Sequence, residues 1–295
     1  MALFGVLITI LMWSTLAASV DSLHNFPTLM LNGIALTIGG LIGLPWVRHW
    51  RMPAGLAVLG STSMLAYHVV YFYALQVGEP VGVSLLHYLW PLLIVVMTPA
   101  SWSRDASVVR QFLGVVLGFT GAIFACIASV ESAQPDVATL TLGMRIFSYG
   151  LGLVSAFAWA GYSLLGRRFG SVSSHSVGLF CLIAGIGCLV LSICAREVPH
   201  FTGRDSITLA YLGLGPMGAA FYMWDYGMKR CDPRKVAILS YATPVLSTIA
   251  LCIHLNRPIS LMTWIGTVLV AIAIAIAPKA KSRSSSSGMS MASES

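Results

Sequence analysis

Ten charge-poor apolar stretches, each about as long as a helix that crosses a lipid bilayer, divide this chain of 295 residues. A hydrocarbon layer about 30 Å thick needs about 20 apolar residues of helix. The stretches lie at residues 2–20, 28–47, 53–76, 80–102, 108–129, 143–166, 173–195, 206–228, 233–254 and 259–277. Barrel strands would be shorter and would alternate apolar with polar residues. The sequence therefore predicts an all-α membrane protein with ten transmembrane helices.

The content and distribution of charged residues agree with a membrane protein and predict its orientation in the membrane. Only 9% of the residues are charged and 57% are hydrophobic, which is too little charge to cover a water-facing globule of this length. Cytoplasmic loops retain Lys and Arg. With the N-terminus inside, 13 of these residues fall in inner loops and four in outer loops. We expect both termini in the cytoplasm, and the net charge of +7 is then explained by membrane insertion and lipid headgroups rather than by nucleic acid.

A motif occurs twice at one offset, which indicates an internal duplication. Glu79-Pro80 followed by Tyr88-x-x-Pro91 recurs 153 positions later as Asp232-Pro233 followed by Tyr241-x-x-Pro244. Because each half holds five spans, an odd number, the second half enters the membrane from the opposite side. The predicted organisation is a five-helix repeat at 1–130, an extracytoplasmic linker at 131–142, an inverted five-helix repeat at 143–278 and a disordered cytoplasmic tail at 279–295.

The second proline of each motif lies near the middle of its span. A proline within a helix cannot donate to the carbonyl four residues earlier, so Pro91 frees the carbonyl of His87 and Pro244 frees that of Ser240. In lipid such a carbonyl must face protein or a wet cavity. We expect a kink at each proline, and the two kinks are candidate hinges beside a substrate site.

Around this depth the sequence offers aromatic and weakly polar groups without Lys, Arg or Glu. Such a pocket favours small amphipathic solutes with an apolar or aromatic part, held by ring contacts and a few hydrogen bonds. His68 and His87 are candidates for a proton relay or for substrate hydrogen bonding, and a neutral packing role stays equally open. Asp225 has Lys229 four residues on, about one turn from the cytoplasmic end of its span, which favours an ion pair that snorkels to the surface.

No pattern in the sequence predicts catalysis or a cofactor. The six cysteines show no Cys-x-x-Cys spacing, and no Walker loop, His-Glu-x-x-His site or Gly-x-Ser-x-Gly elbow occurs. We expect no enzyme activity, no metal and no cofactor, so a concentration gradient would supply the driving force.

The ten-span plan and the order of several short motifs resemble the drug/metabolite transporter superfamily, in its EamA-like branch. These motifs are Met12-Trp13-Ser14-Thr15, His87-Tyr88-Leu89-Trp90-Pro91, Phe157-Ala158-Trp159-Ala160-Gly161-Tyr162 and Ser240-Tyr241-Ala242-Thr243-Pro244-Val245-Leu246. The resemblance is closest to the aromatic amino acid exporters of that superfamily and covers nearly the whole chain except the tail.

The resemblance implies a secondary transporter of the inner (plasma) membrane that exports aromatic and other neutral amino acids or related small metabolites by alternating access. A central cavity would open to one side of a basket-like bundle. Its expected lining residues are Trp13, Tyr67, His68, Tyr88, Trp90, Trp159 and Tyr241. The third, fourth, eighth and ninth spans, flexing near Pro91 and Pro244, would close one end of the cavity while the other opens.

Other functions stay open at this stage. Export of lipophilic drugs or cations would normally use a buried acid, and only Asp225 is available. A solute channel would need charged rings or filter carbonyls that the sequence does not show. The sequence does not determine whether transport is coupled to protons or is facilitated diffusion. It also does not determine to which side of the membrane the resting cavity opens, or which substrates are transported. Its Gly-x-x-x-Gly spacings fit close helix contact either inside the bundle or in a homo-oligomer.

Overall fold

The computed structural model describes residues 1–23, 26–78, 80–99, 101, 108–130, 141–199 and 201–277. Over these residues the chain is helical and contains no strand. Most of the expected linker, the whole expected tail, and the residues Glu79, Arg104, Lys279, Lys281 and Arg283 lie outside the described residues.

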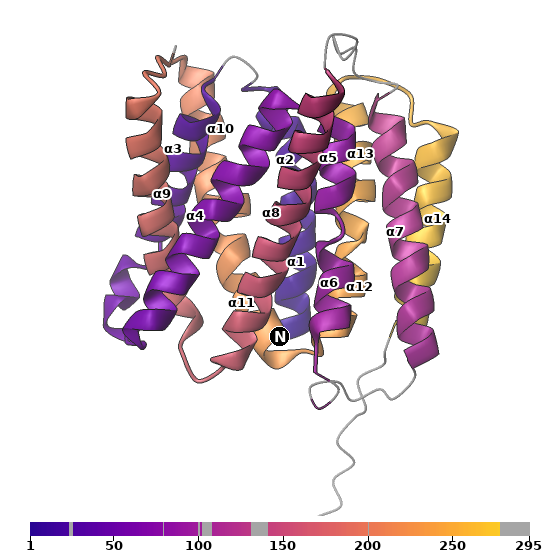
Figure 1. Ribbon diagram of the computed structural model, residues 1–295, viewed down its shortest axis with the longest axis horizontal. Helices are drawn as coiled ribbons and strands as arrows, with labels where there is room; N and C mark the ends of the chain where they lie inside the picture. Colours follow the sequence, from indigo (N-terminus) through magenta and orange to yellow (C-terminus); the bar gives the residue numbers. More distant parts are fainter. Residues whose placement is uncertain are drawn as a thin grey trace, which may run out of the picture.

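All ten apolar stretches are helical over most of their length, and the helices stand side by side in one bundle (Figure 1). The first half contains α1 (Ala2–Ser14), α2 (Leu16–Asp21), α3 (Thr28–Leu41), η1 (Leu44–His49), α4 (Ala54–Val77), α5 (Pro80–His87), α6 (Trp90–Met97) and α7 (Val108–Val130). The second half contains α8 (Leu142–Arg168), η4 (Ser174–Ser176), α9 (Val177–Cys194), α10 (Gly203–Leu214), η5 (Gly215–Ala219), α11 (Ala220–Arg230), α12 (Pro233–Ser240), α13 (Ala242–His254) and α14 (Leu261–Ile276).

Five helical stretches are long and apolar enough, by length and composition, to cross a membrane. They are Ala2–Asp21, Ala54–Val77, Leu142–Arg168, Ser174–Cys194 and Pro233–His254. Four shorter apolar helical stretches accompany them, at Thr28–Leu41, Gly82–Met97, Val109–Phe124 and Leu261–Ile276. Many large apolar side chains lie on the outer surface, among them Phe112 and Ile193, as lipid contact would require.

Short polar residues begin several of the helices. Thr202 and Asp205 form a reciprocal capping box at the start of α10, and Ser260 accepts a hydrogen bond from the backbone N–H of Thr263 at the start of α14. Asp232 accepts from the backbone N–H of Arg234, and Pro233 occupies the first turn of α12, where its missing N–H is not needed.

Both Tyr-x-x-Pro motifs interrupt a helix, as the two prolines predict. The fourth span is divided at Tyr88 and Leu89 into α5 and α6, and the ninth is divided at Tyr241 into α12 and α13. In Figure 1 α5 lies above α6 and α13 lies above α12, so the two broken spans run in opposite directions.

The helix contacts come in pairs that correspond when the two halves of the chain are exchanged. α3 packs along α9, and α7 packs along α14, which joins equivalent spans of the two halves. α4 packs on α8 as α11 packs on α1, and α6 packs on α8 as α13 packs on α1. These matched contacts are the arrangement that an inverted duplication would produce.

Glycines allow the closest of these helix contacts. A Cβ at Gly39 would lie 2.5 Å from the carbonyl oxygen of Met217 and 2.9 Å from the Cα of Gly218. A Cβ at Gly43 would lie 2.7 Å from the hydroxyl of Tyr222, and one at Gly118 would collide with the Tyr241 ring. The Gly39-x-x-x-Gly43 and Gly114-x-x-x-Gly118 spacings therefore serve contacts inside the bundle.

Candidate substrate site

Six aromatic side chains from five different spans meet in the middle of the bundle. This central aromatic cluster consists of Trp13 on α1, Tyr67 on α4, Trp90 on α6, Trp159 on α8, and Phe221 and Trp224 on α11. Phe221 and Trp224 are three residues apart, so they occupy one face of their helix. The cluster contains no charged residue.

Trp159 is the member that touches all the others. The centroid of its ring lies 5.5 Å from that of Trp13, 5.0 Å from that of Tyr67 and 6.4 Å from that of Trp90. The rings of Phe221 and Trp224 lie 5.6 Å and 6.2 Å away. The Trp224 ring is stacked on Trp159 and the other four are edge-on or tilted, and aromatic pairs favour such offset and edge-on geometries. The side chains fill the centre by direct ring contact.

Two indole N–H groups of the cluster are fixed by hydrogen bonds. Trp13 Nε1 donates to the carbonyl of Pro216 at 3.0 Å, inside the π-helical turn η5 that joins α10 to α11. Trp224 Nε1 donates to the hydroxyl of Ser163 at 3.0 Å. A π-helical turn leaves carbonyls out of the regular helical pattern, and such turns are frequent at functional sites.

His68 and His87 flank Tyr67 at the side of the cluster. Their ring centroids lie 4.7 Å and 5.5 Å from the Tyr67 ring. Each histidine is buried, and each has its Nδ1 atom engaged: His68 with the Met64 carbonyl at 2.8 Å and His87 with the Ser155 hydroxyl at 3.0 Å. These contacts fix the orientation of both imidazole rings.

Tyr88 and Tyr241, the tyrosines of the two repeated motifs, take different positions. Tyr88 is half-buried and lies against His87, with ring centroids 5.9 Å apart, at the edge of the central region. Tyr241 is fully buried in another group, beside Phe119, Val245 and Val270. The absence of a side chain at Gly118 leaves room for the Tyr241 ring against α7.

The structure thus brings Trp13, Tyr67, Trp90 and Trp159 together, sets His68 and Tyr88 beside them, and places Tyr241 elsewhere. Pro91 and Pro244 are both buried, next to the interruptions that they cause. Phe221 and Trp224 were not among the residues expected from the sequence. Their spacing by three in an aromatic-rich eighth span was the signal that could have identified them.

A small pocket lies beside the cluster, at the end of the bundle where the N-terminus lies. Its walls include Tyr162, Gly166, Phe180, Asp225 and Lys229. The expected ion pair forms, with 2.6 Å between Lys229 Nζ and Asp225 Oδ2. The expectation that the pair snorkels to the surface is wrong, because the two side chains are only 9% and 6% exposed and are covered by neighbouring helices.

Within the described residues, no three His, Cys, Asp or Glu side chains lie close enough together to hold a metal ion. The central region therefore offers ring faces, indole and imidazole groups and hydroxyls. Groups of these kinds suit a neutral aromatic or amphipathic molecule, which they can hold by stacking and hydrogen bonding.

Comparison with known proteins agrees with this chemistry. The EamA-like transporter family model matches residues 1–127 and 146–277, ranges that fall within the two expected halves. An aromatic amino acid exporter, YddG, from Ancylobacter novellus is 33% identical over 264 residues, which cover 83% of this chain and 85% of the relative. The YddG exporter of Escherichia coli (strain K12) is 23% identical, with 90% of this chain and 92% of the relative covered.

A probable amino-acid metabolite efflux pump of Escherichia coli is also 23% identical, over 84% of each chain. A solved crystal structure superposes with a TM-score of 0.85 at 31% sequence identity, covering 94% of this chain and 96% of the other. The resemblance predicted from the sequence motifs is confirmed. The chain is a membrane protein that belongs to the EamA-like transporter family, within the drug/metabolite transporter superfamily.

Proposed function

We propose that this protein exports aromatic and other neutral amino acids, or related small metabolites, across the plasma membrane. The observation that carries the proposal is the uncharged central aromatic cluster, to which five spans contribute and in which Trp159 contacts every other ring. A substrate ring can replace one of these ring contacts with its own. The names of the relatives support the same substrate class.

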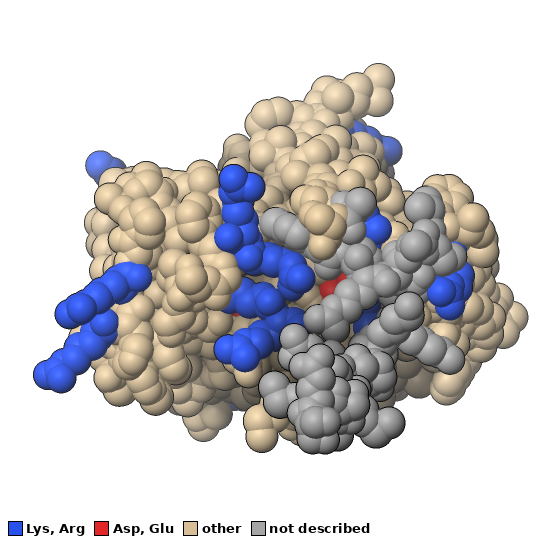
Figure 2. Space-filling view, turned by 90° about the horizontal axis from the view of Figure 1, so that it is seen from below, with Lys and Arg blue, Asp and Glu red and all other residues tan. Residues whose placement is uncertain are grey.

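The proposed transporter crosses the membrane ten times as two inverted five-helix repeats, with both termini in the cytoplasm. The matched helix contacts and the opposite directions of the two broken spans support the repeats. Figure 2 shows Lys and Arg side chains gathered on the face seen from below, which is the end of the bundle that carries the N-terminus in Figure 1. We take this lysine- and arginine-rich end as the cytoplasmic end.

Efflux from cells tests the function and the orientation together. Cells that express the chain with a C-terminal fluorescent protein that matures only in the cytoplasm are loaded with labelled tryptophan, threonine or methionine. We expect fluorescent cells and saturable efflux of at least one of the three, compared with cells carrying the empty vector. Absence of saturable efflux of all three from cells with inserted protein would rule out the function, and dark cells with inserted protein would rule out the orientation.

Export of lipophilic cations is the second candidate, because a buried acid, Asp225, lines the pocket beside the cluster. Its carboxylate is already neutralised by Lys229. This pairing makes a cationic substrate less favourable than a neutral or zwitterionic one. A quaternary ammonium compound that is exported, and that tryptophan does not inhibit, would reverse the order of the two candidates.

We further propose alternating access, with the α5–α6 and α12–α13 breaks as hinges. Replacing Pro91 or Pro244 with alanine allows a hydrogen bond to the freed carbonyl and straightens the span. The maximal efflux rate should fall roughly 3- to 10-fold, while the half-saturating concentration changes less than about 2-fold. Pro53→Ala, at the exposed start of α4, is the matched control. Unchanged rates in both hinge variants would contradict the hinge role.

A further inference from the structure

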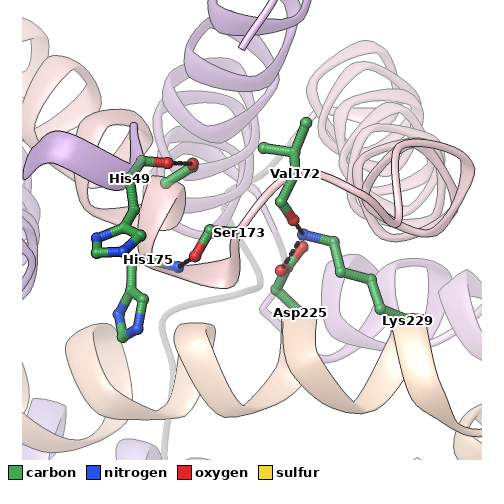
Figure 3. Close-up of polar contacts among 7 residues, drawn as sticks. His49, Val172, Ser173, His175, Asp225 and Lys229 are labelled. Carbon is green, nitrogen blue, oxygen red and sulfur yellow. Dashed lines mark hydrogen bonds and ion pairs between the residues drawn. The ribbon is translucent and has the colours of Figure 1, made fainter. Parts of the chain in front are cut away.

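Basic side chains bind backbone carbonyls of neighbouring elements at the end of the bundle that carries the N-terminus. Arg167, in the last turn of α8, donates to the carbonyls of Met228 and Cys231 at 2.7 Å and 2.6 Å. These carbonyls lie at the C-terminal end of α11, where a helix leaves its carbonyls without internal partners. Lys229 donates to the carbonyl of Val172 at 2.9 Å, and Figure 3 shows its side chain directed toward that group. The two cations therefore join α8, α11 and the segment that leads to α9.

Arg234 makes a similar contact with the first half of the chain. It lies in the first turn of α12, and its Nη2 donates at 2.8 Å to the carbonyl of Thr98, the residue that ends α6. Its Nη1 donates at 2.8 Å to Gln111 Oε1, in the first turn of α7. Thr98 and Gln111 are buried, so these charge-assisted hydrogen bonds are sheltered from competing water. Arg234 thus connects the ninth span to the fourth and the fifth.

The position of Arg234 on α12 makes its contacts sensitive to motion at the helix break. α6 and α12 are the halves of the two broken spans that lie at this end, and they pack on each other (Figure 1). α12 has 8 residues and is about 12 Å long, with Arg234 at the end far from the break at Tyr241. A rotation about the break displaces this far end most. α6 and α12 cannot move apart there without breaking the hydrogen bond between Arg234 and Thr98.

The repeat does not provide the same charged contact at the opposite end of the bundle. At the offset of 153 that relates the two motifs, Arg234 corresponds to Val81 and Lys229 corresponds to Gln76. Valine has no side-chain donor. Gln76 is neutral, and its Nε2 donates to the Thr28 hydroxyl at the start of α3. The duplication therefore places basic residues at one end and uncharged residues at the equivalent positions of the other.

We infer that Arg234 locks this end of the bundle closed, and that release of Thr98 and Gln111 is the step that opens a path from the cytoplasm to the central aromatic cluster. Arg167 and Lys229 form a fixed frame, because they join elements of the second half only. Removing the lock shifts the equilibrium toward the open state by the free energy of the lost hydrogen bonds. This inference rests on the proposed alternating access and orientation, and it names the contact that controls one of the two access states.

Chemical modification of a cysteine placed behind the lock tests this role. Ser240 is the last residue of α12, next to the break, and is 1% exposed. In a Ser240→Cys protein, the thiol at position 240 becomes accessible when α12 separates from its neighbours. Inside-out membrane vesicles present the cytoplasmic face to a membrane-impermeant maleimide, and peptide mass spectrometry gives the rate of modification at each cysteine. The native Cys252, buried on α13 beyond the break, is the internal control for general loss of structure.

In the Ser240→Cys background, Arg234→Gln should accelerate modification at position 240 by about 10-fold or more, because hydrogen bonds from a charged donor are lost. Lys235→Gln removes a charge from the same turn of α12 without altering the contacts to Thr98 and Gln111, so we expect a rate within about 2-fold of the background. Arg234→Lys keeps the charge but has no planar fork, and its rate should lie between the other two. The rate at Cys252 should stay the same in all variants.

Two results would overturn the inference. Equal rates at position 240 in the Arg234→Gln and Lys235→Gln proteins would show that Arg234 does not hold this end closed. Acceleration at both position 240 and Cys252 would show that Arg234 supports the whole fold rather than one end. Modification requires no substrate, so the lock and the proposed function fail separately: unchanged modification in a protein that exports tryptophan refutes only the lock, whereas absence of saturable efflux refutes the proposed function.

Discussion

Replacing Trp159 with alanine should lower the saturable efflux of aromatic substrates by about 10-fold or more. The Trp159 ring contacts every other member of the central aromatic cluster and also Tyr162, so its removal takes away the surface on which a substrate ring would stack. Membrane insertion should be unaffected, because it depends on the apolar character of the whole span. The measurement is the efflux of labelled tryptophan per inserted molecule. The fluorescence of the C-terminal fusion gives the number of inserted molecules.

Trp264→Ala is the control for this substitution. Trp264 lies in the first turn of α14, is 52% exposed and lies outside the cluster. We expect its replacement to leave efflux within about 2-fold of the wild-type value. A Trp159→Ala protein that inserts and transports at the wild-type rate would show that the substrate does not pass through the cluster.

Replacing Gly39 with leucine should destabilise the folded bundle by about 3 kcal/mol or more. The new side chain would meet the Met217 carbonyl and the Cα of Gly218, which are backbone atoms of the π-helical turn and cannot rotate away. α3 and η5 must then separate, and the Pro216 carbonyl that holds Trp13 moves with the turn. The measurement is the apparent melting temperature of the detergent-solubilised protein.

Gly150→Leu provides the comparison. Gly150 lies on α8, and a Cβ there would meet no atom within 4 Å. We expect Gly150→Leu to melt close to the wild-type temperature, since a glycine in a helix has no conformational advantage to lose. If the Gly39→Leu protein has the same melting temperature as the Gly150→Leu protein, the close contact between α3 and η5 does not contribute to stability.

Local features of the sequence predicted the secondary structure well. Long apolar stretches became helices, and Pro91 and Pro244 interrupted the fourth and ninth spans at the expected turns. These outcomes depend on interactions within about four residues, such as the missing N–H of a proline. The π-helical turn at Gly215–Ala219 was not predicted, although Pro216 is visible in the sequence. The turn packs closely on Gly39, which lies 178 positions before Met217 in the chain, and local sequence does not reveal such a contact.

The candidate site was predicted in part. The spacing of Asp225 and Lys229 correctly indicated their ion pair, because residues four apart share a helix face. Its burial was not predicted, because α4, α8 and α9 cover the pair and none of them is near it in sequence. The same limit explains Tyr241: the motif it shares with Tyr88 does not specify that Gly118 on α7 admits its ring.

The sequence by itself determined that this chain is a helical membrane protein, where its helices lie, where two of them break, and the family to which it belongs. Each of these follows from composition, from contacts within one turn, or from the order of short motifs. Only the tertiary structure decided which faces meet: that Phe221 and Trp224 join Trp13 and Trp159, that Tyr241 does not, and that a charge pair is enclosed beside them. The physical reason is that side-chain packing and burial depend on helices brought together from distant parts of the chain, and hydropathy along one helix contains no information about its neighbours.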